Sequence, residues 1–213
     1  DEEVVALKRI NLRIYKGEVC CIFGTSGSGK STLLNQLAGM EKPTKGQVFI
    51  RGKNISDMNE EELAAFRQEH MSFIFQSYNL LPSMTAVENV AMPLMFKGMD
   101  RKRREAMAEE MLKRVGLSHR LHHYPSQMSG GQQQRAGIAR AFVSRPEVVF
   151  ADEPTGNLDT KTTAEIMDMV MGFARRFNQT IILVTHDPGM SRYADRIVTL
   201  VDGIITGDER KGQ

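Results

Sequence analysis

The sequence predicts an α/β fold: a mostly parallel sheet with an antiparallel β edge region and an inserted α-helical subdomain. Two observations support this prediction. Short apolar runs alternate with helical periodicities near both ends of the chain, which is typical of a parallel sheet covered by helices. Between them, the sequence changes to amphipathic helical patterns. We therefore expect residues 1–76 and 145–213 to form one core with its antiparallel region, and residues 77–144 to form the helical subdomain.

The composition is that of an ordinary globular chain. Of 213 residues, 41% are hydrophobic and 25% are charged, and the net charge of +2 neither favours nor excludes a nucleic-acid partner. No apolar run approaches the length of a spanning helix and no signal peptide opens the chain, so we expect any membrane role to depend on another polypeptide. Cys20 and Cys21 are adjacent on a predicted strand and should point to opposite faces, as reduced, buried thiols typical of a cytosolic protein.

The first part of the chain predicts strands that lead into a glycine-rich loop. We expect strands at 4–7, 11–14 and 18–23, with a turn at 16–18. Residues 24–32 then match G-x-x-x-x-G-K-[ST] at every fixed position, and leucines at helical spacing follow. The fixed positions are Gly24, Gly29, Lys30 and Ser31, and the loop also contains Ser26, Gly27 and Thr32.

This succession of strand, loop and helix indicates a phosphate-binding loop and hence a P-loop NTPase core. Glycines let successive backbone N–H groups face inward around phosphate oxygens, and the helix that follows adds its positive dipole end. Lys30 supplies a positive charge for the β- and γ-phosphates, and the Ser31 hydroxyl is a ligand for Mg²⁺. A glycine-rich turn with a chance Lys-Ser pair is the simpler alternative, which the flanking strand and helix disfavour.

The middle of the chain predicts mainly helices. One of them opens on the basic run 101–104, which we expect to be a solvated helix face. Because no aromatic residues interleave this run, a nucleic-acid role for it is disfavoured. The expected elements are a strand at 47–50, a helix at 60–68, a strand at 71–75, a helix at 85–99 kinked at Pro93, and a charged helix from 100 to Gly116.

The last part of the chain returns to alternating strands and helices. One apolar strand ends in Asp152 and Glu153, a pair that alone is more often a surface turn. In a protein with a phosphate loop, Asp152 would hold Mg²⁺, and Glu153 would lie closer to the γ-phosphate, where it could orient water. The expected elements are strands at 148–151, 180–185, 196–201 and 204–206, the last two joined by the hairpin turn Asp202-Gly203, and a helix at 162–176.

A second glycine-rich segment, Ser129-Gly130-Gly131-Gln132, precedes a helix rich in Ala and Arg. Such a helix start is an anion site for the same physical reason as the first loop. The simpler alternative is a flexible turn with Ser129 as the N-cap. A chain with one phosphate loop hardly needs another such site for the same nucleotide, unless that site serves a neighbouring chain.

Together these motifs resemble the ATP-binding-cassette ATPases over nearly the whole chain. Five motifs occur in the family's order, and Asn157-Leu158-Asp159 falls at the position of its D-loop. The stretches 75–82, 123–127 and 155–159 are most similar to the branch of macrolide and peptide exporters, lipoprotein-release ATPases and the cell-division ATPase. The five motifs are the phosphate loop at 24–32, Gln76 after a strand, Ser129 to Gln132, Asp152-Glu153, and His186 after a strand.

The resemblance implies a Mg²⁺-dependent ATPase that pairs head to tail with a second copy and drives a separate integral membrane permease. The chain would be cytoplasmic, on the inner face of the cell membrane, with a RecA-like core, a helical subdomain touching the permease, and no nucleic-acid partner. The resemblance assigns catalysis to Glu153, His186 and Gln76, metal binding to Ser31, Gln76 and Asp152, and ATP contacts to Gly24, Ser26, Gly27, Gly29, Lys30, Ser31 and Thr32, with Ser129, Gly130, Gly131, Gln132 and Asp159 acting across the dimer.

Other functions stay open at this stage. A cell-division-type ATPase would regulate a membrane partner without transport. Soluble relatives that act on DNA or ribosomes usually carry long coils, zinc motifs or two cassettes, and none of these features occurs in the sequence. A small-molecule kinase would leave Ser129 to Gln132 unexplained. Met128 replaces the family's usual Leu and conserves volume, while the aromatic residue that stacks on adenine is not placed, Tyr15 being a poor candidate.

Overall fold

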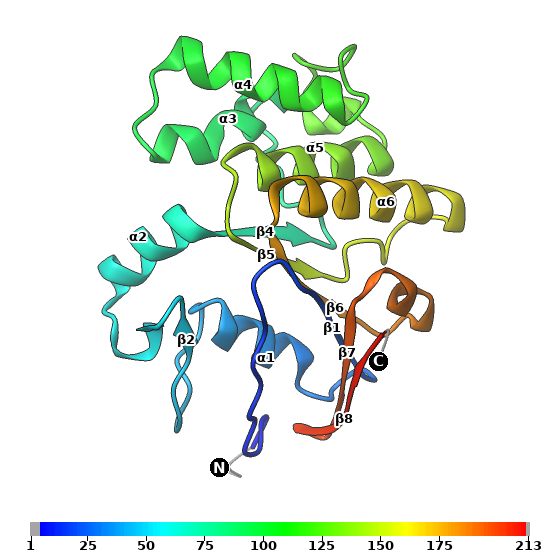
Figure 1. The fold of residues 1–213 in the computed structure, drawn as a ribbon. Helices are drawn as coiled ribbons and strands as arrows, with labels where there is room; N and C mark the ends of the chain where they lie inside the picture. Colours follow the sequence, from blue (N-terminus) through cyan, green and yellow to red (C-terminus); the bar gives the residue numbers. More distant parts are fainter. Residues whose placement is uncertain (1–4, 212–213) are drawn as a thin grey trace.

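The computed structural model describes residues 5–211 and contains a six-stranded sheet in the order β4-β5-β6-β1-β7-β8 (Figure 1). The first five of these strands are parallel to their neighbours, and β8 runs antiparallel to β7 at the edge. The α/β fold with an antiparallel edge is therefore confirmed. The strands are β1 (Val19–Phe23), β4 (Met71–Phe75), β5 (Val148–Asp152), β6 (Thr180–Thr185), β7 (Arg196–Val201) and β8 (Ile204–Arg210), and a separate antiparallel pair consists of β2 (Phe49–Ile50) and β3 (Lys53–Asn54).

Helices cover both faces of the sheet because its central strands are apolar on both sides. Successive residues of β1 point to opposite faces: Cys21 belongs to one buried cluster and Ile22 to the other. Figure 1 shows α1 on one face and α5 and α6 on the other. The helices of the core are α1 (Lys30–Leu37), α2 (Glu60–His70) and α6 (Thr160–Phe177), with short 3₁₀ turns at η1 (Ile55–Asp57), η2 (Pro125–Gln127) and η3 (Pro188–Tyr193).

Two further helices, α3 (Ala86–Phe96) and α4 (Arg101–Arg114), pack against each other and against α5 (Gly130–Val143), which itself covers the sheet. Thr85 and Glu88 form a reciprocal capping box at the start of α3, which satisfies backbone N–H groups that would otherwise be unpaired. The helix continues through Pro93 for three more residues. The division of the chain into a core and a helical subdomain of residues 77–144 stays a prediction.

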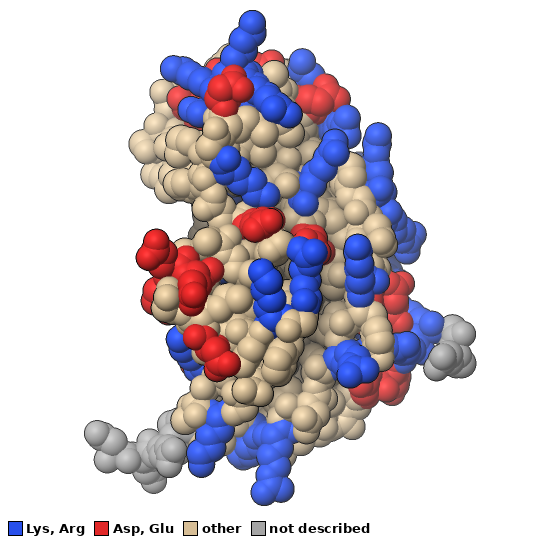
Figure 2. Space-filling model, turned by 60° about the vertical axis from the view of Figure 1, so that its left-hand side comes forward, with Lys and Arg blue, Asp and Glu red and all other residues tan. Residues whose placement is uncertain are grey.

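In the basic run at the start of α4, Arg101, Lys102 and Arg103 are solvent-exposed, as predicted, whereas Arg104 is half-buried. Arg101 pairs with Glu105 one helical turn later, and near the end of the helix Arg114 pairs with Glu110. Figure 2 shows the resulting mixture of Lys and Arg with acidic side chains over this end of the molecule. The helix surface is therefore a region of mixed charge.

The predicted strands at 4–7 and 11–14 do not form within the described residues, and Val4 lies outside them. Burial alternates along residues 10–14, and Ile10 and Ile14 pack against the core cluster on the α1 face. The segment nevertheless has no ladder partner, and its Lys8 N–H makes a single backbone hydrogen bond to the Gly203 carbonyl, 2.7 Å. Alternating burial marks a segment that packs, whereas a strand also requires a neighbouring strand with which to pair.

Both cysteines lie on β1, buried and unpaired. Burial is the main reason that the pKa of each thiol rises to about 12, so both stay protonated and unreactive near neutral pH. Among the residues that the structure describes, no helix combines the length and the apolar character needed to cross a membrane.

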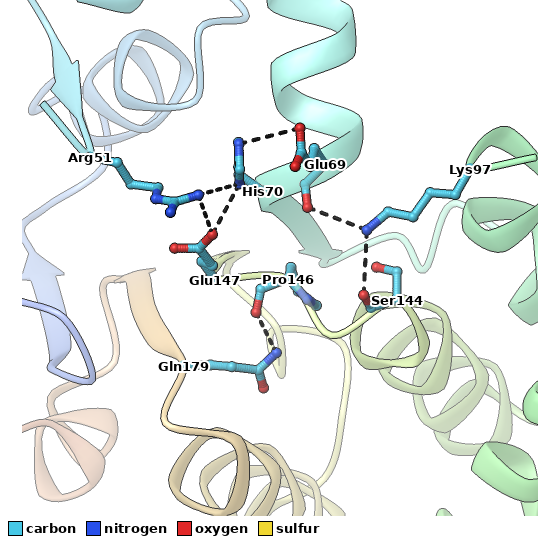
Figure 3. Close-up of polar contacts among 8 residues, drawn as sticks. All are labelled: Arg51, Glu69, His70, Lys97, Ser144, Pro146, Glu147 and Gln179. Carbon is cyan, nitrogen blue, oxygen red and sulfur yellow. Dashed lines mark hydrogen bonds and ion pairs between the residues drawn. The ribbon is translucent and has the colours of Figure 1, made fainter. Parts of the chain in front are cut away.

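Polar side chains fasten the amino ends of β4 and β5 (Figure 3). His70, just before β4, places Nδ1 3.0 Å from Glu147 Oε1, and Arg51 lies 2.7 Å from the same oxygen. Gln179, just before β6, donates its side-chain N–H to the carbonyl of Pro146, 2.6 Å away. These contacts lie opposite the strand ends that bear the predicted site residues.

Candidate nucleotide-binding site

The carboxyl ends of β1, β4, β5 and β6 meet along one edge of the sheet, as expected for parallel neighbours. A cavity of about 820 Å³ opens there. Four motifs that are far apart in the sequence therefore lie around one space. The predicted site residues that line this cavity are Gly24, Ser26, Gly27, Gly29, Lys30, Ser31, Thr32, Gln76, Asp152, Glu153 and His186.

The phosphate loop joins β1 to α1 through a backbone that requires glycine. Gly29 adopts φ +97°, a left-handed conformation that side chains disfavour, immediately before α1 begins. A Cβ at Gly24 would collide with the Leu200 carbonyl oxygen on the neighbouring strand β7. No side chain caps the N-terminus of α1, so its free N–H groups remain available to an anion.

Lys30 and Asp152 provide opposite charges in this cavity. Lys30 is buried, and its Nζ donates a 2.7 Å hydrogen bond to the Thr25 carbonyl, which folds the side chain back along the loop. Burial, followed by the nearby charge of Glu153, raises the pKa of Asp152, whereas Lys30 lowers it. The charged form of the Asp152 carboxylate is therefore disfavoured by burial and by Glu153 and favoured by Lys30.

The oxygen atoms of this site suit a hard divalent cation. Ser31 offers a hydroxyl, Asp152 a carboxylate and Gln76 an amide oxygen, and all three line the cavity. Within residues 5–211, no group of three His, Cys, Asp or Glu side chains could form a complete metal cage. Mg²⁺ is usually held in such sites by one or two protein ligands together with phosphate oxygens and water, so the residues present fit that ion.

Glu153 is held in a defined orientation beside the phosphate loop. Its φ of +43° is unusual for a residue with a side chain, and its N–H donates to the Val184 carbonyl, 2.9 Å. One carboxylate oxygen accepts a 3.0 Å hydrogen bond from the Thr185 hydroxyl. The other accepts from the His186 backbone N–H at 3.0 Å and lies 2.6 Å from His186 Nδ1. Such backbone strain at a cavity is typical of functional positions.

Gln76 follows β4 and is tied to the loop after β5. Its carbonyl accepts a 3.1 Å hydrogen bond from Asn157 Nδ2, and its own amide nitrogen lies 3.5 Å from Asn157 Oδ1. A Cβ at Gly156 would lie 2.6 Å from the Gln76 amide nitrogen, so the two loops approach closely. Gln76 is exposed and faces the same cavity as Asp152.

The remaining predicted site residues do not line this cavity. Ser129 and Gln132 form a reciprocal capping box at the start of α5, so the N-cap interpretation of Ser129 holds. Asp159 caps α6. Its carboxylate accepts hydrogen bonds from the Thr162 hydroxyl and, with a smaller effect, from the Thr162 backbone N–H, and both lower the pKa of Asp159. Within one chain, Ser129, Gly130, Gly131, Gln132 and Asp159 are therefore separate from the phosphate loop.

Several lining residues carried no signal in the sequence. Lys8 and Asp202 border the cavity because the N-terminal segment and the β7–β8 turn pass next to the loop. The sequence indicates Asp202 only as part of a hairpin turn. Among residues 5–211, the aromatic side chains that line the cavity are those of Phe23 and His186. Tyr15 lies elsewhere, with its ring 4.7 Å from the Arg210 guanidinium carbon.

Comparison with known proteins gives a consistent result. The model of the ABC transporter family matches residues 7–156. The ABC transporter ATP-binding protein YtrE of Bacillus subtilis (strain 168) is 45% identical over 207 residues, covering 97% of this chain and 90% of YtrE. The macrolide export ATP-binding/permease protein MacB of Shewanella sp. (strain W3-18-1) is 48% identical over 211 residues, but this chain, 99% of which is covered, spans only 32% of MacB.

A solved structure agrees with the fold. The dimeric post-hydrolysis state of the ATP-binding cassette MJ0796, bound to ADP and Pi, matches with a TM-score of 0.89 and 42% identity, covering 96% of this chain and 90% of the other. The family match, the nearly full-length relatives and the shared cassette fold lead to one conclusion: this chain belongs to the family of ABC transporter ATP-binding proteins, and it is an ABC-type ATPase.

Proposed function

We propose that this chain binds and hydrolyses Mg-ATP as one half of a head-to-tail homodimer and so drives a separate integral membrane permease. The observation that carries the proposal is the position of Glu153. Its carboxylate is held by Thr185 and His186 and lines the same cavity as the phosphate loop. This geometry suits a base that orients water toward the terminal phosphate.

The residues of the cavity divide the work of hydrolysis. The loop N–H groups and Lys30 would hold the β- and γ-phosphates, and Ser31, Asp152 and Gln76 would hold Mg²⁺. When bound, Mg²⁺ would supply positive charge that offsets the negative charge of the phosphates. Glu153 would orient the water molecule and accept its proton as the oxygen attacks the γ-phosphorus. His186 would contact the γ-phosphate, and Lys30 would stabilise the negative charge on the departing ADP.

A second copy would complete the site. Ser129, Gly130, Gly131 and Gln132 lie outside the cavity of their own chain, so a contact between this segment and ATP requires the ATP of another chain. Asp159, at the start of α6, would lie at the same interface. The dimeric state of the MJ0796 cassette supports this arrangement.

The membrane partner is proposed from the relatives. MacB is named as a joint ATP-binding and permease protein, of which this chain matches one part. We propose that a permease performs the membrane step here and that residues 77–144 contact it. The chain would then be cytoplasmic and peripheral on the inner face of the membrane. An export or lipoprotein- or peptide-extrusion role fits this branch of the family.

Two measurements test the proposal. Purified protein with Mg-ATP is expected to release inorganic phosphate to water, whereas transfer of phosphate to an added acceptor without such release would indicate a kinase. The Glu153→Gln chain with Mg-ATP is expected to retain an integral membrane permease from detergent-solubilised membranes. ATP-dependent dimers that retain no membrane protein would contradict the permease half of the proposal while leaving the ATPase half intact.

A further inference from the structure

Two buried glutamines of this chain make the same contact, a hydrogen bond to the carbonyl of a proline, in different places. Gln134, on α5, donates its amide N–H to the carbonyl of Pro154 at 2.5 Å, and Gln179 donates to the carbonyl of Pro146 at 2.6 Å (Figure 3). Both side chains are almost fully buried, and among the described residues neither Oε1 has a hydrogen-bond partner. The two residues differ in position: Pro154 directly follows Glu153, whereas Pro146 lies before β5 at the opposite end of the sheet.

A half-paired buried amide is costly to the fold. A buried acceptor without a hydrogen-bond partner is unfavourable for the folded state. A buried side chain with an unpartnered polar atom next to a reacting group calls for a functional explanation. Gln134 meets that condition, since the residue whose carbonyl it holds is joined to the strained Glu153.

The helix that carries Gln134 touches both loops of the cavity. Arg140, six residues further along α5, is buried and donates to the carbonyls of Tyr78 at 2.9 Å and Asn79 at 2.6 Å, in the loop that follows Gln76. The side chain of Asn157 donates to the Gln76 carbonyl at 3.1 Å and joins that loop to the one after Glu153. The side chains of Gln134, Arg140 and Asn157 all donate to backbone carbonyls, and together they link α5 and the two loops into a closed ring of contacts.

We propose that Gln134 is a positioning residue for hydrolysis: it ties the Glu153 loop to α5, so that the position of the α5 N-terminus sets the orientation of the Glu153 carboxylate. This inference rests on the proposed function, in which Ser129 and Gly131 at that N-terminus contact the ATP of the second copy. Contact between the α5 N-terminus and the ATP of the second copy would then affect, through α5, the orientation of Glu153 in the chain's own ATP site. Gln134 itself does not line the cavity and acts only through Glu153.

The substitution Gln134→Met tests this role, because methionine has a similar shape and lacks both the amide donor and the unpartnered oxygen. Gln179→Met is the matched control, since it removes the same contact from the remote end of the sheet. Each variant removes an unpartnered oxygen but also leaves a proline carbonyl without its donor, so we expect the Tm to change by a similar amount in both. Only Gln134→Met is expected to lower kcat for phosphate release, by tenfold or more, with the KM for ATP within twofold of the parent.

Each outcome has a distinct meaning. Equal kcat in Gln134→Met and Gln179→Met, with the parent active, would overturn the inference and leave the proposed function standing. A lower Tm and a proportionate loss of activity in both variants would assign both glutamines to stability alone and would also overturn it. A parent that releases no phosphate would remove the proposed function and the inference with it. Should Gln134→Met fail to fold, Gln134→Leu is measured against Gln179→Leu under the same criteria.

Discussion

The two ends of the six-stranded sheet both carry ionisable side chains, and they place them in different surroundings. At the carboxyl ends, Lys30, Asp152 and Glu153 face a cavity of about 820 Å³. At the amino ends, charged groups are paired within the chain: Arg196 at the start of β7 binds Asp208 through two hydrogen bonds of 2.6 Å. An ion pair formed within the chain contributes to the stability of the fold, whereas charged side chains around an open cavity can interact with a ligand.

The pKa values of two aspartates follow the same contrast. Burial raises the pKa of Asp152, which lacks a hydrogen-bonded cationic partner in the described chain. The hydrogen bonds from Arg196 lower the pKa of Asp208. The surroundings of Asp152 thus disfavour its charged form, whereas the surroundings of Asp208 stabilise its charged form. The four predictions below test this distinction between the two ends.

The largest effect is expected for Glu153→Gln. The amide keeps the shape of the carboxylate but cannot accept the proton of water, and a positioned base typically contributes 10²–10⁴-fold to rate. We expect phosphate release to fall by roughly 100-fold or more, with ATP binding retained. The ATP-dependent dimer is expected to persist and is measured by light scattering. Release at the parent's rate would remove Glu153 from the role of base.

Lys30→Met is expected to weaken ATP binding rather than the chemical step alone. A hydrogen bond to a charged group contributes about 1.5–3 kcal/mol, which corresponds to roughly a 10- to 100-fold loss of affinity. Titration calorimetry with ATP measures the change. Lys113→Met, at an exposed position on α4, is the matched control and should bind ATP as the parent does. Unchanged affinity in Lys30→Met would separate this residue from the phosphate site.

Arg196→Met tests the opposite end of the sheet. Besides Asp208, the guanidinium donates to the Arg13 carbonyl at 2.5 Å, and its removal leaves these groups unpaired. Because Asp208 is partly exposed, we expect a loss of about 2 kcal/mol in the free energy of unfolding, below the range for a fully buried pair. ATP affinity of the folded protein should stay within twofold of the parent. Loss of affinity without loss of stability would show that the two ends are not independent.

The sequence predicted best the features that depend on local patterns. The strand at Thr180–Thr185 has the predicted bounds, and the phosphate loop, Asp152 and Glu153 meet at one cavity because parallel strands end at the same edge. Features that depend on tertiary partners were harder to predict. Residues 11–14 alternate in burial yet have no strand beside them, and Asp202 borders the cavity only because its turn packs next to the loop.

The segment from Ser129 to Gln132 has a different limit. Its sequence predicted an anion site and, alternatively, an N-cap, and the structure shows the N-cap. The geometry of the first would depend on another copy, whose position a single sequence does not define. Gln134 had no signal of its own, because its distinguishing feature is an unpartnered oxygen that arises from packing between α5 and the loop after β5.

The smallest expected effects concern the pH dependence of stability. Asp208 has a lowered pKa when folded, so its stabilising contribution is complete above its unfolded pKa of about 3.9 and is lost as the pH falls through the folded value. Asp152 has a raised pKa when folded, so its contribution is complete below about pH 3.9 and is lost as the pH rises through the folded value.

Near neutral pH, Asp208→Asn should therefore lower the Tm and Asp152→Asn should raise it, each by about 1–3 °C for a domain of this size. Thermal unfolding followed by circular dichroism between pH 3 and pH 8 measures both changes. On acidification, the loss of stability should be shallower in Asp208→Asn than in the parent, because that variant no longer loses the Arg196 pair. If both substitutions lowered the Tm at neutral pH, the carboxylate at the cavity would be as well compensated within the chain as the one paired with Arg196, and the proposed difference between the two ends would not hold.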